Sequence, residues 1–382
     1  MRESGDDVLM AMKKENVFQW SRTSGLRTQL HRLPKVDLHR HLEGSLRLET
    51  LSEIAREHGI DLPSYDIEYL RPFVTVTEEK PDFHRFLEKF RLLRRFYPNR
   101  GVVERVAYEA VADAASDNVR YLELRFNPIA QARVQGFSIA DVTSWVCGAV
   151  AQAAGDLELK ANLIIQIGRD ESLQTAEELV DVAVAYRDQG IVGLDLAGDE
   201  VGYSARRFSE LFKRARRDGL RTTVHAGEAG GAINVAEAIQ LLGAQRIGHG
   251  VRAIENSKIV RLVRDRKVTL EVCPTSNLQT GVVHRFGQHP LPDLLALDLR
   301  VTINTDDPSV SDTTLTDEYM VAMLGMGLTF SQVKQTILNA ARGSFLEPEE
   351  RRALVESMRR ELGLNGAYRK GNQREDDVDF NS

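Results

Sequence analysis

Short apolar runs rich in β-branched residues recur along the chain, and most are separated by longer segments in which apolar residues return at helical spacing. Two of these helical patterns, residues 176–190 and 204–219, end at Gly190 and Gly219, where glycine commonly closes a helix. The eight runs that predict strands are residues 35–41, 119–126, 161–168, 192–198, 221–227, 245–250, 268–274 and 300–306.

Eight strands alternating with helices predict an α/β fold with a parallel sheet and, by their number, a (β/α)8 TIM barrel. The segment from about 48 to 118 is too long for one crossover helix, so we expect a helical insertion after the first strand. Extra helices are expected at the C-terminal end. An open doubly wound sheet is the alternative, but no glycine-rich phosphate loop follows the first strand.

The polar pattern of the two ends sets the expected domain boundaries. Residues 1–30 are mixed polar and predict an N-terminal extension. Residues 31–365 are expected to form a single barrel domain, which includes the insertion. The polar residues 366–382 predict a disordered tail.

Composition narrows the class of protein. The 382 residues are 42% hydrophobic and 28% charged, as in a globular protein, and the net charge of −6 gives no general attraction to nucleic acid or anionic membranes. The two cysteines, Cys147 and Cys273, offer no disulfide framework. With neither a signal peptide pattern nor an apolar run of about 20 residues, a cytoplasmic protein is expected. The sequence does not indicate an oligomeric state.

Polar side chains gather where the predicted strands end. His39 and His41 lie at the end of the first strand, His225 at the end of the fifth, His249 at the end of the sixth and Asp306 at the end of the eighth. Active sites of such barrels lie at the carboxyl ends of the strands, so we expect these five side chains to meet there.

A metal ion is the partner that these side chains require. His39 and His41 are two residues apart on a strand and face the barrel interior together, where buried imidazoles need partners. Alone, such a pair is more often ordinary polar surface. With His225 and Asp306 as further ligands it predicts a zinc site, with iron or manganese possible. One metal per chain is expected, because the fourth strand has no lysine to bridge two.

Three residues near these ligands are candidates for chemistry or substrate contact. Glu228 can serve as a general acid, although a carboxylate at a helix N-terminus is the ordinary interpretation. Asp307 can face the substrate, or simply form a turn before Pro308. Gly198 permits close approach of a ligand to the backbone, or marks only a tight turn. His249 and Asp306 can orient a metal-bound water and take its proton.

Phe86, Leu87 and Phe90, together with Phe83, form one apolar stripe on a predicted helix of the insertion. Such a stripe usually packs into a core, but it can also cover a substrate at the barrel mouth. Arg85 and Lys89 on the same helix are expected on its solvated face. His289 can contact the substrate, but the start of a helix is the preferred interpretation.

The motifs LHRHLEGS, LAGDE, VHAGE, RIGHG, CPTSN and NTDDP occur in the order and spacing of the adenosine deaminase family of the amidohydrolase superfamily, and the resemblance spans roughly residues 33–345. It implies a zinc hydrolase that replaces the 6-amino group of a purine by oxygen and releases ammonia. The implied metal ligands are His39, His41, His225 and Asp306.

The resemblance also implies roles for the other residues of these motifs. Glu228 would protonate purine N1 and His249 would activate and steer the hydroxide. Asp307 would hydrogen-bond N7, and the backbone N–H of Gly198 would donate to N3. His41 is counted among the substrate contacts as well.

Glu43 departs from the family pattern, in which an aspartate often contacts the ribose 5′-hydroxyl. The longer side chain also occurs in relatives that deaminate adenine or aminodeoxyfutalosine. Adenosine and 2′-deoxyadenosine are the expected substrates. Adenine and aminodeoxyfutalosine are the alternatives, and an inactive ligand-binding barrel is a remote one.

A phosphorylated substrate is disfavoured because the sequence shows no evident basic cluster to bind the phosphate. A nucleic-acid deaminase is disfavoured because there is neither a basic stripe nor the cysteine-rich zinc signature.

Overall fold

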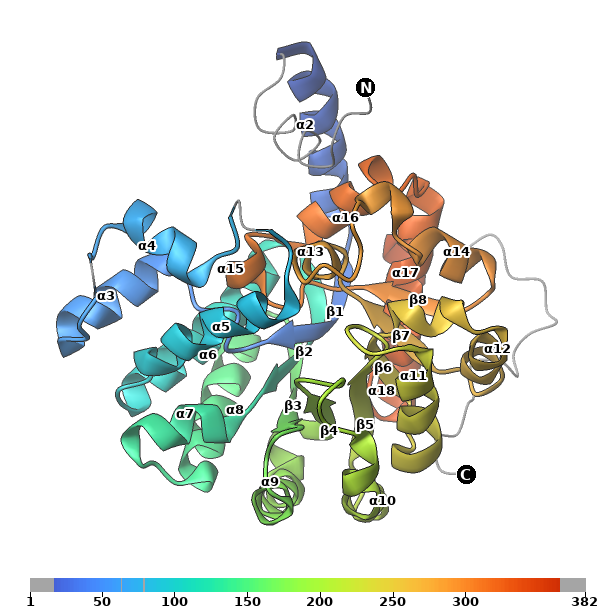
Figure 1. The fold of residues 1–382 in the computed structure, drawn as a ribbon. Coiled ribbons are helices and arrows are strands. Elements are labelled where there is room, and N and C mark those ends of the chain that lie inside the picture. The colour runs from blue at the N-terminus through green and yellow to red at the C-terminus, as the bar shows by residue number, and fades with distance from the viewer. Residues whose placement is uncertain (1–16, 63, 78–79, 365–382) are drawn as a thin grey trace.

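The computed structural model describes residues 17–62, 64–77 and 80–364, and it is a barrel of parallel strands with helices outside (Figure 1). The eight strands follow one another around the barrel in chain order, β1 to β8. Their bounds are β1 Lys35–His41, β2 Val119–Phe126, β3 Lys160–Gly168, β4 Ile191–Ala197, β5 Arg221–Ala226, β6 Arg246–His249, β7 Thr269–Val272 and β8 Arg300–Ile303. The predicted fold class is confirmed.

Closure of the barrel between β8 and β1 takes place beyond the last residue of β8. Arg40 and Asp306 form a parallel bridge. The N–H of His41 donates to Asp306 O at 2.8 Å, and the N–H of Asp306 donates to His39 O at 2.8 Å. These bonds fix the backbone of three residues predicted to be ligands. The prediction that the eighth strand itself runs to Asp306 is wrong, because β8 ends at Ile303.

The outer layer consists of helices that follow the strands. Their bounds are α7 Pro128–Gln135, α8 Ile139–Asp156, α9 Leu173–Ala185, α10 Ser209–Arg217, α11 Ala232–Glu237, α12 Ser257–Asp265, α13 Pro274–Gln279, α14 Leu291–Ala296, α15 Pro308–Ser311, α16 Leu315–Leu324, α17 Phe330–Gly343 and α18 Pro348–Glu361. Shorter helical turns are η1 Arg94–Phe96, η2 Arg187–Gln189, η3 Ala205–Phe208, η4 Ala238–Leu242, η5 Val251–Glu255 and η6 Phe286–Gln288. The extra C-terminal helices are thus present.

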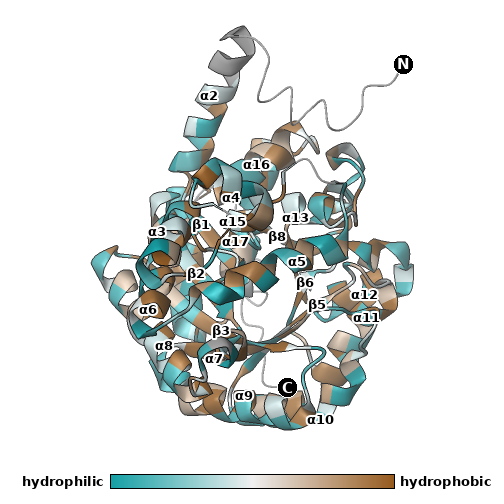
Figure 2. Cartoon of the chain, turned by 60° about the vertical axis from the view of Figure 1, so that its left-hand side comes forward, coloured by the Kyte–Doolittle hydropathy of each residue, from teal (hydrophilic) through white to brown (hydrophobic). Residues whose placement is uncertain are grey.

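Helix ends follow the sequence signals. Gly190 and Gly219 have φ of 98° and 92°, the left-handed conformation that glycine adopts without a steric cost. In Figure 2 the outer helices carry hydrophilic and hydrophobic residues together, as amphipathic helices do. The strands β1, β6 and β7 are buried along their whole length although each carries polar or charged residues, so these side chains need partners inside the protein.

Four helices stand between β1 and β2: α3 Leu48–His58, α4 Ile67–Val74, α5 Phe83–Leu93 and α6 Arg100–Ser116. The insertion is tied to the loops at the barrel mouth. The N–H of Val76 donates to Val310 O at 2.7 Å, and the N–H of Asp82 donates to Gln279 O at 3.1 Å. These bonds join the α4–α5 region to the segments after β8 and β7, so the insertion lies against the end of the barrel where the strands terminate.

The first described helix, α2 (Val17–Arg32), extends away from the barrel and lies beside α16 (Figures 1 and 2). Arg27 forms an ion pair with Asp317 at 3.0 Å. Of the predicted extension, residues 1–16 lie outside the described residues, as does the predicted tail 366–382. No helix among the described residues has the length and apolar character to cross a membrane.

Candidate active site

Four histidines and an aspartate come together where the strands end. His39 and His41 belong to β1, His225 to β5 and His249 to β6, and Asp306 follows β8. All five are buried, at 8% relative exposure or less. The imidazole centroid of His39 lies 4.6 Å from that of His225 and 4.9 Å from that of His249. The convergence expected from the strand ends is therefore present in the structure.

Three of the imidazoles present their Nδ1 atoms to an acceptor. His39 Nδ1 lies 2.8 Å from Glu271 Oε2, His41 Nδ1 2.7 Å from Gln166 Oε1, and His225 Nδ1 3.0 Å from Asp195 Oδ1. Burial lowers the pKa of His41 to about 4, and it also lowers the pKa of His225. A neutral ring that donates through Nδ1–H carries a lone pair on Nε2, which is the form that binds a metal.

The Nε2 atoms of His39 and His41 and a carboxylate oxygen of Asp306 lie close enough together to bind one cation. His39 Nε2 and His41 Nε2 lie 3.3 Å apart, and Asp306 Oδ1 is 3.1 Å and 3.2 Å from them. Two atoms that each bind a tetrahedral zinc ion at about 2.0–2.1 Å stand about 3.3 Å apart, so the spacing fits a shared ion. His39, His225 and Asp306 also fall within one group of potential ligand atoms, which includes His249.

A buried salt-bridge network lies behind the ligands and was not predicted. Arg125 Nη1 lies 3.0 Å from Asp195 Oδ2, and Arg125 Nη2 lies 2.9 Å from Glu271 Oε2. One guanidinium thus holds both carboxylates that orient His39 and His225. Asp195 and Glu271 are acidic residues inside otherwise apolar strands, and this sequence signal could have identified them because a buried charge requires a partner.

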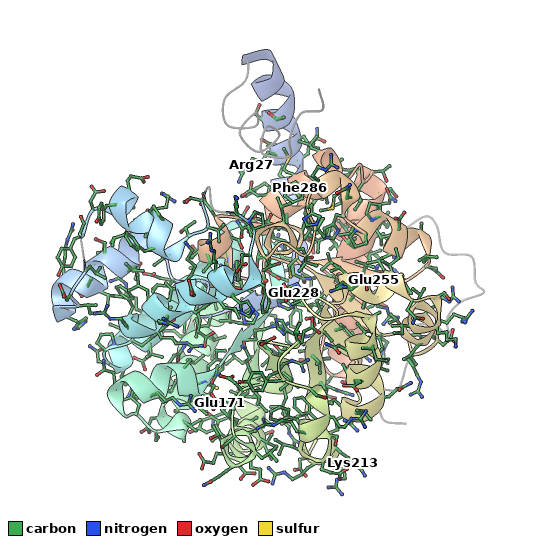
Figure 3. The ribbon with its side chains drawn as sticks, in the orientation of Figure 1. Arg27, Glu171, Lys213, Glu228, Glu255 and Phe286 are labelled. Carbon is green, nitrogen blue, oxygen red and sulfur yellow. The ribbon has the colours of Figure 1, made fainter. Side chains whose placement is uncertain are left out.

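Glu228 lies near the centre of the molecule in this view, whereas Lys213 lies at its lower edge (Figure 3). Its Oε2 atom is 3.5 Å from His249 Nε2. Burial raises the pKa of Glu228 well above its ordinary value, and the carboxylates of Asp306 and Glu200 add to the effect. A raised pKa favours the protonated form of the carboxyl group, which is the form that can donate a proton to a bound ligand.

Glu200 holds the turn that carries Glu228. Its carboxylate accepts from the N–H groups of Gly227, Glu228 and Gly230, at 2.9, 2.7 and 2.7 Å. Asn234 Nδ2 adds a fourth bond at 2.9 Å. Glu200 was missed in the sequence, although it stands in the LAGDE motif beside Gly198. Gly198 itself has φ of 99° directly after β4, a conformation that favours glycine.

His249 is the last residue of β6 and adopts φ of 60°, and Asp306 likewise has φ of 62°. Left-handed backbone at residues other than glycine is uncommon and concentrates at functional sites. Asn277 Nδ2 lies 3.1 Å from His249 Nδ1, whereas the other three rings face an oxygen at this position. Asn277 was also missed, although CPTSN follows β7 directly.

Asp307 presents a buried carboxylate oxygen, Oδ1, that has no hydrogen-bond partner. Burial raises the pKa of Asp307 well above its ordinary value, with Asp306, Glu43 and Glu228 adding to the effect. Gly44 lies against it so closely that a Cβ atom there would be 1.9 Å from Oδ1. Buried polar atoms are usually hydrogen-bonded, so an unpaired buried oxygen at this position makes Asp307 a candidate for contact with a ligand.

Glu43 is buried beside this group, at 6% relative exposure. Its Oε1 atom accepts from the N–H of Asn127 at 2.8 Å, and burial raises its pKa to about 7. The side chain is therefore committed in part to the loop after β2.

The predicted stripe on α5 divides between two environments. Phe86 is buried, and its ring lies 6.0 Å from that of Phe90. Leu87 is 37% exposed and lines a surface hollow of about 370 Å³ with Arg91 and Arg94. The expectation that Lys89 lies on a solvated face is wrong: it is buried and donates to Pro72 O, because it closes the C-terminal end of α4.

Comparisons with known proteins agree with this site. The sequence model of the family described as adenosine deaminase matches residues 34–361. An adenosine deaminase of Aliivibrio fischeri is 40% identical over 327 residues, 86% of this chain and 98% of that protein. The structure of an adenine deaminase from Arthrobacter aurescens gives a TM-score of 0.81 at 30% identity, covering 87% of this chain and 99% of the other. An amidohydrolase from Burkholderia ambifaria, solved with bound zinc, gives 0.81 at 29% identity, covering 88% and 93%.

The parallel barrel, the cluster of histidines and aspartate at its mouth and these structural neighbours define the class as an amidohydrolase. Within that class, the chain belongs to the adenosine deaminase family, and it is a hydrolytic purine deaminase. The family resemblance seen in the motifs is thereby confirmed.

Proposed function

We propose that this protein hydrolyses adenosine and 2′-deoxyadenosine to inosine and 2′-deoxyinosine with release of ammonia. The observation that carries the proposal is a buried Glu228 carboxyl group facing His249 beside the candidate ligand cluster. An aminohydrolase needs a proton donor at a ring nitrogen and an oxygen nucleophile at the adjacent ring carbon, and Glu228 and His249 are placed to serve these two positions.

The proposed ligands are His39, His41, His225 and Asp306, with one zinc ion as the metal. The spacing of 3.1–3.3 Å among His39 Nε2, His41 Nε2 and Asp306 Oδ1 supports this choice, and His225 falls in one group of potential ligand atoms with His39 and Asp306. The zinc-bound relative from Burkholderia ambifaria agrees with it. When bound, such an ion lowers the pKa of its water to near 7 and so supplies hydroxide at neutral pH.

The proposed roles of the chain's own residues follow from their positions. Glu228 gives its proton to purine N1, which makes C6 more electrophilic, and His249 holds and orients the attacking oxygen. Asp307 pairs its free Oδ1 with N7, and the N–H of Gly198 donates to N3. Addition of the oxygen at C6 and loss of ammonia then complete the exchange, and the site should bind the tetrahedral carbon most tightly.

Adenine is the second candidate substrate, because a solved adenine deaminase has the same fold at 30% identity and because Glu43 stands where an aspartate would contact the sugar. A screen of ammonia release from adenosine, 2′-deoxyadenosine, adenine, AMP and aminodeoxyfutalosine tests the choice. We expect the two nucleosides to give the highest kcat/KM. A higher value for adenine or aminodeoxyfutalosine would contradict the proposal.

The proposal includes a small-molecule substrate and a cytoplasmic location. The location is supported by the free thiols of Cys147 and Cys273, both of which are buried.

A further inference from the structure

A line of buried polar groups leads from the site to α14 and has no assigned role. Asn277 on α13 contacts His249 on one side and His289 on the other. Its Nδ2 atom is 3.1 Å from His249 Nδ1, and its Oδ1 atom is 3.3 Å from His289 Nε2. The N–H of Leu291 donates to His289 Nδ1 at 3.0 Å. Exposure of the three polar residues is 0% for Asn277, 1% for His249 and 4% for His289, so water does not compete for these bonds.

The backbone donor at one end fixes the direction of every bond in the line. Because Leu291 N–H donates to it, Nδ1 of His289 carries no proton, and a neutral His289 therefore carries its proton on Nε2. That proton is donated to Asn277 Oδ1. The amide of Asn277 then turns its NH₂ group to His249 Nδ1, which must accept. Burial lowers the pKa of His289 to about 3, in agreement with a neutral ring.

The position of the proton on the His289 ring also excludes the opposite orientation of the Asn277 amide. If Nδ2 faced His289, then Nε2 of that ring would accept while Nδ1 already accepts from Leu291. A ring that accepts at both nitrogens is an imidazolate, which a buried site without a bound cation cannot hold.

His249 consequently differs from the other three histidines of the site. Their Nδ1 atoms face oxygens of Glu271, Gln166 and Asp195, so their Nε2 atoms are free to bind a metal. In His249 the acceptor is Nδ1, so the proton lies on Nε2, which points toward Glu228 at 3.5 Å and Asp306 at 3.9 Å. This distinction separates His249 from the ligands, although distance alone groups it with them.

Taking the proposed aminohydrolase reaction as given, we propose that His289 and Asn277 are positioning residues that keep the proton of His249 on Nε2. His249 then donates a hydrogen bond to the attacking oxygen, and it serves neither as a metal ligand nor as the group that first removes a proton from water.

The direct test is the tautomer of His249 in the zinc-loaded enzyme without substrate. Long-range ¹H–¹⁵N correlation spectra of ¹⁵N-histidine-labelled protein distinguish a protonated ring nitrogen from a bare one, and loss of signals in His249→Gln assigns the ring. We expect a protonated Nε2 and a bare Nδ1. A bare Nε2 would overturn the proposal. Because no substrate is present, an error in the substrate assignment would leave this result unchanged.

Two substitutions test the line of bonds through kinetics. Asn277→Asp keeps the shape but places an acceptor against His249 Nδ1, so the proton should move to Nδ1. We expect kcat to fall by about 10²–10³-fold, the cost of losing one preorganised donor, with KM changed by less than about threefold. The same variant should show the shifted proton in the spectrum. A wild-type kcat, or a proton that stays on Nε2 of His249, would contradict the proposed role of this line of hydrogen bonds.

His289→Leu removes the donor to Asn277 Oδ1, whereas His289→Gln keeps an N–H near the same position. We expect kcat to fall about 10–100-fold in the first variant and to be largely restored in the second. His284→Gln, an exposed histidine five residues earlier, is the matched control and should retain wild-type kcat. Equal losses in His289→Leu and His289→Gln would show that the ring acts only by filling space, and the proposal would fail.

Discussion

Several residues at the barrel mouth adopt states that cost stability. His249 and Asp306 have left-handed backbone, and Glu228 and Asp307 are buried carboxyl groups with raised pKa values. Such features persist where function requires them, because ordinary packing would replace them. All four of these residues are ones to which we assign chemistry. Left-handed backbone also occurs at residues to which we assign none, namely Asn118, Glu158, Lys267, Asp298 and Asp312.

Glu228→Gln tests the proton donor. The amide has almost the same shape but cannot protonate N1, so we expect kcat to fall by roughly 10²–10⁴-fold. Metal content and binding of a non-hydrolysable purine nucleoside should be preserved, which calorimetry and elemental analysis would check. A variant with near wild-type turnover would exclude Glu228 as the acid.

His225→Ala tests the ligand set. Removal of one imidazole leaves an incomplete site, and we expect the metal to be lost on dialysis together with activity. Elemental analysis gives the stoichiometry, and His284→Ala, which alters an exposed histidine, should retain the metal. One zinc per chain in dialysed His225→Ala would show that His225 is not a required ligand.

The sequence predicted the four histidines and Asp306 of the site because they lie where strands end, and the strands of a parallel barrel end at one rim. It missed Glu200 and Asn277, and it considered His289 as a substrate contact but preferred the start of a helix. Their contacts join segments after β4, β5, β6 and β7 that are remote in sequence. A carboxylate that accepts from a distant turn leaves no spacing pattern. Asp195 and Glu271 did leave one, since each interrupts an apolar strand.

At the scale of elements, strand order, the helical insertion and the bounds of β1 and β2 could be predicted from the sequence, whereas the ends of β7 and β8 could not. Residues 268–274 and 300–306 read as strands of equal length, yet β7 and β8 are only four residues each. The remaining residues pair elsewhere: the bridge of Arg40 with Asp306 belongs to barrel closure. Tertiary pairing of this kind has no signature in a single segment.

Gly44→Ala tests the fit between the turn after β1 and the loop after β8. A Cβ atom would lie 1.9 Å from Asp307 Oδ1, so that carboxylate must move. Displacement of a substrate-positioning group by about 1 Å can cost about 10²-fold in kcat/KM, and we expect a loss of that order with the metal retained. Gly148→Ala in α8, where a Cβ meets nothing within 4 Å, is the control and should leave the kinetics unchanged.

Glu318 on α16 holds the start of α13, since its carboxylate oxygens accept from Thr275 N–H at 3.1 Å and Thr313 Oγ1 at 2.9 Å. Burial raises its pKa from 4.5 to about 8, so folding favours the protonated form. The stability that this group contributes is complete below about pH 4.5 and is lost as the pH rises to about 8.

Glu318→Gln removes this titration. We expect its Tm, relative to the wild type, to increase steadily between pH 5 and pH 8, as followed by scanning calorimetry. Glu356→Gln, which changes an exposed carboxylate of α18, should track the wild type. Parallel curves for Glu318→Gln and the wild type would show that Glu318 does not titrate in this window.

For the whole molecule, the proposed metal ligands come from β1, β5 and the segment after β8. A bound metal holds these separate parts of the barrel together, so we expect it to stabilise the closed barrel. A metal at 1,000 times its Kd adds about 4 kcal/mol to the free energy of unfolding. We expect a chelator to lower Tm by several degrees and to abolish activity, and added zinc to restore both. A Tm unchanged by complete removal of the metal would contradict this coupling.

Within three residues, the loop after β4 contributes both to the proposed purine contact and to the position of Glu228. Gly198 is proposed to meet the purine, and Glu200 anchors the turn that presents Glu228. Whatever shifts one end of so short a segment shifts the other. Altering this loop to admit a different heterocycle would therefore disturb the timing of protonation as well. Engineers who seek a new substrate range would therefore need to leave the backbone from Gly198 to Glu200 unchanged.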